Sequence, residues 1–383
     1  MTSRLTFTIL VALVAAVAAG AQTPPAPDLK GHVDALSDFD YPTRMNAARM
    51  VRRAEPGEAV PALTEAVRSH PDEFVRYRAL VLLTSFNDRG TEPLMRAMMS
   101  DRNDRIREVV YRWYERYPDT SLTPSLLAAL NTEQAEFVRP ALVRALASLD
   151  ADAQVQRTLL AEVGRGLDFF RSAVIEALGD HRAEYAVDAL NALAVVDGPL
   201  QDDAVLALGR IGDRRALTSL STLTNAPLTV IPALQAALCL LEDACAARLT
   251  VLSETARSRA ATTEASRASV AALGAVAATG HPMATQALFD LAGDATGRLR
   301  DDVAIALAAS ALRGADDVLT WLQRAPEASR TSLIELLREG FESLEEDFAE
   351  EQLFAAARAA YWAAPEESVT RTVTAILIDR LEF

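Results

Sequence analysis

The feature that most constrains this chain is a helical pattern that returns every 30 to 35 residues between positions 44 and 330. Recurrence at this interval is typical of proteins in which each unit is a helical hairpin that buries its apolar face against its neighbours. We therefore expect an all-α fold, an α-solenoid or superhelix of about ten stacked hairpins with long open surfaces. Alignment of the units places these residues in one column: Arg44, Arg76, Arg107, Arg139, Arg171, Gln201, Ile231, Ser266, Arg300 and Arg330.

The helical period is clear within each unit. Positions three, four and seven residues after the column residue are almost uniformly apolar, and these positions share one face of a helix. The residue six places after the column is often alanine, as at Ala145 and Ala306. A small side chain there would let a neighbouring helix approach closely.

Glycine follows the apolar residue at the seventh position in three units, as Gly179, Gly209 and Gly274. Glycine is common just beyond helix ends, and aspartate is common in turns. We therefore predict that these glycines, with Asp180 and Asp213, form corners between helices and have no part in a binding site.

The first 21 residues resemble a secretory signal. Arg4 precedes an apolar stretch that ends in Ala19-Gly20-Ala21, so we expect cleavage after Ala21 and export to a bacterial periplasm or out of the cell. The alternative is an uncleaved anchor, because the apolar stretch approaches the length of a bilayer span. No later segment has the composition of a membrane span, and we expect the mature chain to be a monomer without one.

The remaining chain divides into three parts. Residues 22–37 contain three prolines and are expected to form an exposed lead-in, residues 38–338 form the solenoid, and residues 339–383 form acidic and capping helices. The acidic stretch 339–351 either forms a solvated helix face or attracts a basic partner.

Charge makes nucleic acid an improbable ligand. The chain has 38 basic and 53 acidic residues, a net charge of −15, and loss of Arg4 with the leader would make it −16. Such a chain repels phosphate backbones unless its basic residues gather on one face, and no long basic run exists. We expect no nucleic acid partner.

The two cysteines, Cys239 and Cys245, are six residues apart. Export would favour a disulfide between them, which requires the chain to turn near residues 242–244, where the repeat places a corner. Two reduced thiols within the core are the alternative. A loop this short would give modest stabilisation.

The repeat resembles the HEAT family, particularly its short bacterial form, the phycobilisome-lyase type. The matching segments are Asp72 to Leu80, and Ala173 to Asp180 followed by Ala186 to Leu193, within a resemblance that extends over about residues 40 to 340. The resemblance implies a protein-binding architecture, since its motif identifies a fold rather than an activity. It also implies that the column arginines tie neighbouring hairpins together through acidic side chains and carbonyls.

Those arginines permit a second interpretation. A stripe at one register could bind carboxylates or phosphates. We favour the structural role for the arginines of the column: Arg44, Arg76, Arg107, Arg139, Arg171, Arg300 and Arg330.

No pattern in the sequence predicts catalysis, a metal site or a cofactor. The four histidines are scattered, with no second histidine or cysteine three to five residues away, and paired aspartates such as Asp301-Asp302 fall at expected helix starts, where they favour the helix dipole. There is no G-x-S-x-G elbow, phosphate-binding loop or Cys-x-x-Cys. A pair of converging carboxylates could still support hydrolysis.

An aromatic cluster spans residues 111–117. Tyr111, Trp113 and Tyr114 occupy core positions of the repeat, whereas Arg112, Arg116 and Tyr117 are candidates for contact with a partner.

We interpret the chain as an exported, non-enzymatic scaffold or adaptor that binds a protein or peptide on the solenoid surface. Two alternatives are an accessory enzyme that acts on a protein substrate, suggested by the resemblance to lyases that attach bilin pigments, and a structural component of the cell envelope.

Overall fold

The computed structural model describes residues 29–223, 226–242, 245–258, 260–313, 315–344 and 347–381. The expected signal segment, residues 1–21, and the start of the expected lead-in, residues 22–28, lie outside the described residues. Every regular element in the described ranges is helical, which confirms the all-α prediction. No helix within these ranges combines the length and apolar character needed to cross a bilayer.

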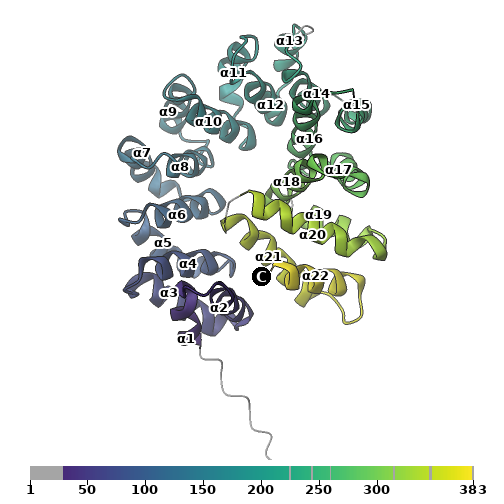
Figure 1. The fold of residues 1–383 in the computed structure, drawn as a ribbon. Coiled ribbons are helices and arrows are strands. Elements are labelled where there is room, and N and C mark those ends of the chain that lie inside the picture. Colours follow the sequence, from purple (N-terminus) through teal and green to yellow (C-terminus); the bar gives the residue numbers. More distant parts are fainter. Residues whose placement is uncertain are drawn as a thin grey trace, which may run out of the picture.

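The helices alternate between an outer and an inner layer of a solenoid (Figure 1). Four short 3-10 turns precede or connect helices, at Ala35–Ser37, Arg89–Thr91, Thr120–Leu122 and Glu184–Ala186. The outer helices are α1 (Leu29–Asp34), α3 (Pro56–Ser69), α5 (Glu92–Met98), α7 (Thr123–Thr132), α9 (Ala153–Val163), α11 (Val187–Ala194), α13 (Ala216–Leu220), α15 (Cys245–Arg257), α17 (Pro282–Asp294) and α19 (Ala315–Arg324). The inner helices are α2 (Tyr41–Arg53), α4 (Glu73–Thr84), α6 (Asp104–Arg116), α8 (Val138–Ala147), α10 (Asp168–Asp180), α12 (Gln201–Ile211), α14 (Val230–Leu241), α16 (Thr263–Ala277), α18 (Arg298–Arg313) and α20 (Glu327–Ser343). The last two helices are α21 (Asp347–Ala363), which also contacts the inner helices α4 and α18, and α22 (Val369–Leu381).

The inner helices are those that begin at the repeat column. Each packs against its outer partner and against the next inner helix, as α6 does on α8 and α10 on α12. The apolar positions predicted from the period form the core: Leu146, Leu178 and Leu208 are fully buried. Tyr111, Trp113 and Tyr114 are also buried, as their positions in the repeat predicted.

Domain boundaries in the structure differ from those expected. Helix α1 begins at residue 29, so residues 29–37 form part of the first pair rather than an exposed lead-in. Helix α20 continues through the expected boundary between 338 and 339. Helices α21 and α22 then form another stacked pair.

Most column residues donate a hydrogen bond to a backbone carbonyl at the end of the preceding helix or in the turn that follows it. The last carbonyls of a helix lack partners within it, so a donor there satisfies groups that would otherwise be unpaired. Gln201 and Ser266, where arginine is missing, do the same through Ala194 and Ala256, both at 2.9 Å. The arginine bonds are Arg44 to Asp38, Arg76 to Val67, Arg107 to Asp101, Arg171 to Val163 and Arg330 to Gln323.

The remaining column arginines contact acidic or aromatic groups. Arg139 lies 3.9 Å from Glu162 and stacks over Phe170, and Arg300 pairs with Glu339 of α20. Arg371 of α22 bonds to the carbonyl of Ala364 in the same manner, so it extends the column into the last pair. Sequence alignment missed Arg371 because it follows Arg330 by more than one repeat interval.

The prediction that glycines form helix corners is wrong. Gly179 and Gly209 lie inside α10 and α12, and each faces the alanine at the sixth position of the next inner helix. A Cβ on Gly209 would lie 2.5 Å from Cα of Ala237, closer than real atoms approach. Glycine is needed here because two helix backbones pack almost directly against each other.

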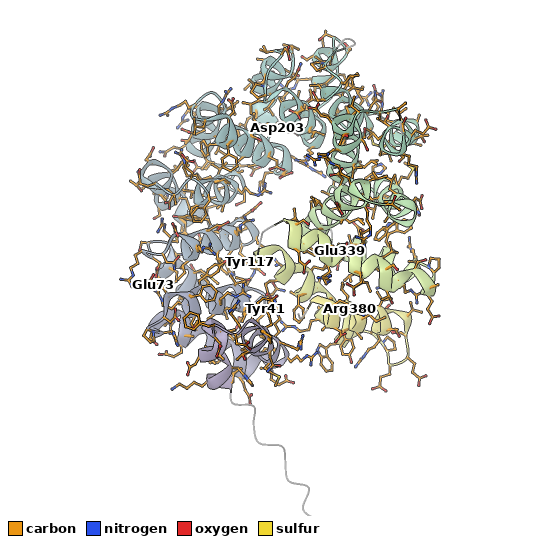
Figure 2. All side chains as sticks on the ribbon, viewed as in Figure 1. Tyr41, Glu73, Tyr117, Asp203, Glu339 and Arg380 are labelled. Carbon is orange, nitrogen blue, oxygen red and sulfur yellow. A yellow bond between two sulfur atoms is a disulfide. The ribbon has the colours of Figure 1, made fainter. Side chains whose placement is uncertain are left out.

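The two ends of the solenoid meet. The buried guanidinium of Arg52, at the end of α2, pairs with the buried carboxylate of Glu351 on α21. Arg358 of α21 donates to the carbonyls of Arg52 and Ser85, both at 3.0 Å, and stacks over Phe86 at 4.4 Å. Figure 1 shows α21 and α22 beside the first pairs, and Figure 2 labels Tyr41 of α2 and Arg380 of α22 on the two sides of this seam.

The closure places the last pair of the stack against the first two. It also bears on the acidic stretch 339–351, which was expected either to form a solvated helix face or to attract a basic partner. At the two ends of this stretch, Glu339 pairs with Arg300 and Glu351 is buried against Arg52. The basic partners of these two carboxylates belong to the same chain.

The close approach of α12 and α14 predicts opposite effects for two glycine substitutions. Gly209→Ala should lower the free energy of unfolding by about 1–3 kcal/mol, because the added methyl overpacks the contact with Ala237. Gly57→Ala in α3, where no atom lies within 4 Å of the new Cβ, should be neutral or stabilise by up to about 1 kcal/mol. Urea unfolding of both variants tests this, and equal effects would contradict it.

Candidate functional site

The inner helices surround a cavity of about 1020 Å³. Six of them, α6, α8, α10, α12, α16 and α18, each direct the residue five places after the column into it. This row was not singled out from the sequence, although the helical period places it away from the buried positions. The six residues are Arg112, Arg144, Glu176, Leu206, Ala271 and Ile305.

A chain of ion pairs connects four of these helices. Arg144 of α8 contacts Glu115 of α6 at 2.9 Å and Asp180 of α10 at 2.9 Å. Asp180 also contacts Arg210 of α12 at 3.2 Å, and His181 lies 3.2 Å from Glu115. Asp180 was expected to be only a corner residue, yet it links α8 to α12.

The pKa values in this network follow from burial and pairing. Burial alone would raise the pKa of Glu115, but the contacts with His181 and Arg144 outweigh it and lower the pKa to about 2. Burial would likewise lower the pKa of Arg144, yet the carboxylates of Glu115, Asp180 and Glu176 raise it above the ordinary arginine value. Glu115 and Arg144 are therefore both charged at neutral pH.

The pKa of Asp203 on α12 is shifted in the opposite direction to that of Glu115. Burial raises its pKa, with the negative charges of Asp202 and Glu176 acting in the same direction and a hydrogen bond to Ser172 opposing them.

The opposite side of the cavity is less charged. Arg267 of α16 contacts Asp302 of α18 at 3.2 Å, and small apolar residues such as Ala275 and Ala309 lie beside them. One wall thus presents fixed charges while the other presents small side chains. Such a lining can hold a flexible chain through hydrogen bonds to the guanidinium groups and through apolar contacts.

Only two of the three candidate contact residues face the cavity. Arg112 and Arg116 line the cavity, and Arg112 is paired with Glu108 on the same helix. Tyr117 is not part of the lining; its ring packs against Trp113 and lies beneath the guanidinium groups of Arg89 and Arg116.

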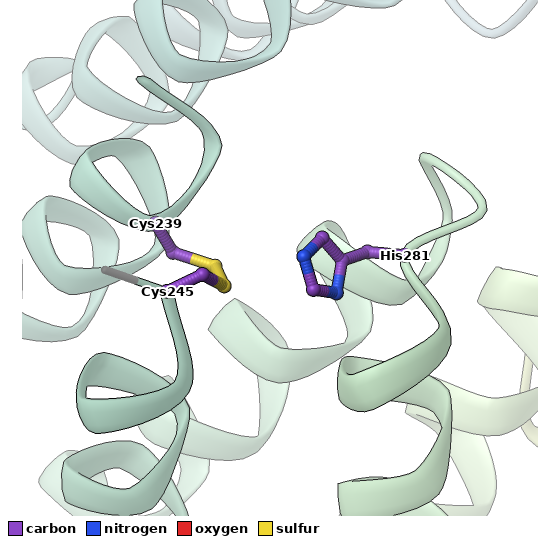
Figure 3. A group of neighbouring side chains, drawn as sticks. All are labelled: Cys239, Cys245 and His281. Carbon is purple, nitrogen blue, oxygen red and sulfur yellow. A yellow bond between two sulfur atoms is a disulfide. The ribbon is translucent and has the colours of Figure 1, made fainter. Parts of the chain in front are cut away.

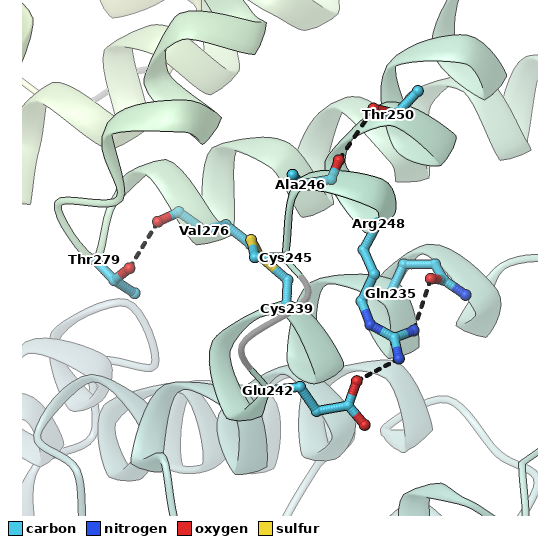
Figure 4. The surroundings of a disulfide bond; sticks show 9 residues. All are labelled: Gln235, Cys239, Glu242, Cys245, Ala246, Arg248, Thr250, Val276 and Thr279. Atoms are coloured by element: carbon cyan, nitrogen blue, oxygen red, sulfur yellow. Dashed lines mark hydrogen bonds and ion pairs between the residues drawn. A yellow bond between two sulfur atoms is a disulfide. The ribbon is translucent and has the colours of Figure 1, made fainter.

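The two cysteines are joined as a disulfide where α14 ends and α15 begins. Figure 4 shows Arg248 beside this bond, with its guanidinium contacting Gln235 and Glu242. The disulfide therefore lies at a corner where the ion pair between Arg248 and Glu242 also links α15 to the end of α14.

His281 lies beside the disulfide, with ligand-type atoms of Cys239, Cys245 and His281 all within 4.8 Å of one another (Figure 3). Sequence spacing did not reveal this group, because His281 comes from the next outer helix start. Zinc binds cysteine as the thiolate. While the two sulfurs are bonded to each other, the group does not offer a zinc ligand set.

A second cavity, of about 700 Å³, lies at the seam between the ends of the chain. Arg53 and Glu55 line it from the corner after α2, and Trp362 and Asp379 line it from the last pair. The guanidinium of Arg371 stacks on the neighbouring Tyr361 ring at 4.1 Å.

Large exposed apolar side chains gather on one edge of the solenoid, where each outer helix turns into its inner partner. Nine of the fourteen such side chains in the described residues lie at these turns in the first seven pairs, so their distribution is far from even. We call this set the apolar rim: Phe39, Tyr41, Phe74, Phe137, Leu167, Phe169, Val195, Val196 and Leu228.

Comparisons with known proteins agree with this architecture. The sequence matches the family described as HEAT repeats over residues 29–112 and 60–147. No curated protein matches the chain.

The chain is also similar to several solved structures. The complex of CpcE and CpcF of phycocyanin lyase from Nostoc sp. PCC7120 is 18% identical, with 65% of this chain and 93% of that chain covered and a TM-score of 0.40. Human deoxyhypusine hydroxylase in complex with glycerol is 17% identical, with 68% and 97% covered and a TM-score of 0.29. Importin beta is 14% identical, with 92% and 64% covered and a TM-score of 0.39.

The lowered pKa of Glu115 predicts a pH dependence of stability. Its ordinary value is 4.5 and its value in the fold is about 2, so the stabilisation is complete above pH 4.5 and is lost as the pH falls toward 2. The full contribution corresponds to roughly 3 kcal/mol. In urea unfolding between these pH values, Glu115→Gln should lose less stability than the wild type. Parallel pH profiles would contradict the assignment.

Proposed function

We propose that this chain, whose residues 29–112 and 60–147 match the HEAT-repeat family, is a non-enzymatic scaffold that holds a segment of a protein partner on the inner surface of its superhelix. The observation that carries the proposal is the central cavity, which six inner helices line with one register of side chains. Repeat proteins bind partners over such concave surfaces because each unit adds a few contacts.

The lining suits a peptide segment. Arg112, Arg144 and Arg210 present guanidinium groups whose orientation is set by carboxylates behind them. Such groups can donate hydrogen bonds to backbone carbonyls or carboxylates of a bound chain. The cavity volume is at the upper end of the range for small-molecule pockets, which favours an extended segment over a compact ligand.

We also propose export to the periplasm or beyond the cell, with cleavage after Ala21. The leader pattern motivates this, and the bond between Cys239 and Cys245 supports it, since disulfides persist in oxidising compartments.

Photo-crosslinking from inside the cavity tests the scaffold function. A photoreactive residue in place of Ile305, which lines the cavity, should form covalent adducts with one partner protein in intact cells. The same residue in place of Val251, which is exposed on outer helix α15, is the matched control and should not yield that adduct. Identical adducts from both positions, or none from Ile305, would contradict binding at the inner surface and favour a structural envelope component.

Export has a direct test. The intact mass of the protein purified from the periplasmic or extracellular fraction should correspond to a chain that starts at Gln22 and contains one disulfide. A full-length mass in the membrane fraction would instead show an uncleaved anchor, and recovery of reduced full-length protein from the cytoplasm would contradict export.

The contact between His181 and Glu115 motivates an enzymatic alternative. A histidine held by a carboxylate at the wall of a cavity can act as a general acid or base. If the protein is an accessory enzyme, incubation with the purified partner that crosslinking identifies should change the mass of that partner. His181→Gln should abolish the change. A scaffold leaves the partner's mass unaltered.

A further inference from the structure

Polar contacts tie together the first four turns along the edge that carries the apolar rim. His70 lies 3.3 Å from Asp34, which connects the first two turns, and Arg102 pairs with Glu73 across the next. Arg107 then contacts Glu133 at 2.7 Å in the turn that carries Phe137. These contacts fix the spacing of the turns that carry Phe39, Phe74 and Phe137.

The rim is also acidic. The six turns along this edge, residues 38–43, 70–74, 99–105, 133–138, 164–169 and 195–202, include eleven aspartates and glutamates against three arginines. Five column arginines follow within two residues of these turns, and three of them pair with Asp101, Glu133 and Asp168, yet the edge still carries eleven acidic against eight basic residues. Several of the acidic residues are exposed beside the apolar ones, including Asp38, Glu136 and Asp197. Two of the arginines, Arg102 and Arg165, are already paired with carboxylates.

The charge decides among possible occupants. An anionic bilayer would be repelled by the acidic turns, and a second copy of the chain stacked rim to rim would place like charges opposite each other. A protein segment that alternates apolar side chains with lysine or arginine satisfies both features. Exposed apolar patches bordered by polar groups commonly mark protein interaction sites.

We infer that the apolar rim docks a basic amphipathic segment of the partner protein. This inference rests on the proposed function, since it assumes a protein partner, but it concerns a different surface from the cavity. The rings insert into the apolar face of the segment, while the surrounding carboxylates pair with its cationic face.

Fluorescence anisotropy with a labelled synthetic helical peptide, built from a leucine face and a lysine face, tests the inference. The mature chain should bind this peptide in physiological salt and should not bind the matched leucine–glutamate peptide. Phe137→Ser combined with Phe169→Ser, at rim positions 45% and 65% exposed, should weaken binding by about tenfold.

The control removes two exposed apolar side chains elsewhere. Val251→Ser combined with Met283→Ser, at positions 47% and 46% exposed outside the rim, should keep affinity within about twofold of the wild type. Circular dichroism and thermal melting confirm that both double variants are folded, since all four side chains are exposed.

Several results would overturn the inference. These are absence of binding to the leucine–lysine peptide, equal loss in the two double variants, or binding of the leucine–glutamate peptide. Rim-dependent binding to phosphatidylglycerol vesicles, or a rim-dependent dimer in sedimentation velocity, would assign the surface to a membrane or to a second copy instead. The Ile305 crosslink is independent of the rim, so failure of the cavity proposal and failure of this inference can be distinguished.

Discussion

The packing of each inner helix on the next determines the rest of this structure. At Gly179 and Gly209 the backbone of one inner helix lies almost against the alanine of its neighbour, and from α6 to α20 neighbouring inner helices pack more extensively than neighbouring outer helices do. Stacked pairs whose inner sides are closer than their outer sides curve around the inner side. Repeated over the chain, this curvature brings the last pair back to the first.

Closure gives the inner surface a defined shape. Once Glu351 pairs with Arg52 and Arg358 caps the carbonyls at the ends of α2 and α4, the positions of the two ends are fixed relative to each other. A buried ion pair adds little net stability, but loss of one partner leaves an uncompensated buried charge, which costs about 3–5 kcal/mol. Within this curved frame, the charged side chains of α6, α8, α10 and α12 face the small side chains of α16 and α18.

Features that depend on local residue spacing could be predicted from the sequence. Apolar residues at fixed distances from the column arginine predicted the inner helices and the burial of residues such as Leu178, and carbonyl capping by Arg76 and Arg171 follows the contacts that the family resemblance implied. Gly209 could not be placed correctly, because glycine favours both helix ends and close helix contacts, and only the neighbouring helix distinguishes them.

Contacts that depend on the accumulated geometry of many helical pairs could not be predicted from the sequence. Arg52 and Glu351 are 299 residues apart, and their contact depends on small rotations accumulated along the whole stack. The cavity depends on the same sum, so Arg112 and Arg116 could be singled out as contact residues but not placed opposite α16 and α18. His281 joins the cysteines for the same reason, since adjacent outer helices bring them together.

The central claim is that the solenoid closes on itself. The most direct measurement is the distance between spin labels at Glu55→Cys and Asp379→Cys, two exposed positions that line the same cavity from opposite ends of the chain. Double electron–electron resonance should give one narrow distribution of short distances between the labels. When Glu351→Ala breaks the seam, the distances should become longer and their distribution broader. A long, broad distribution in the chain with Glu351 intact would contradict closure.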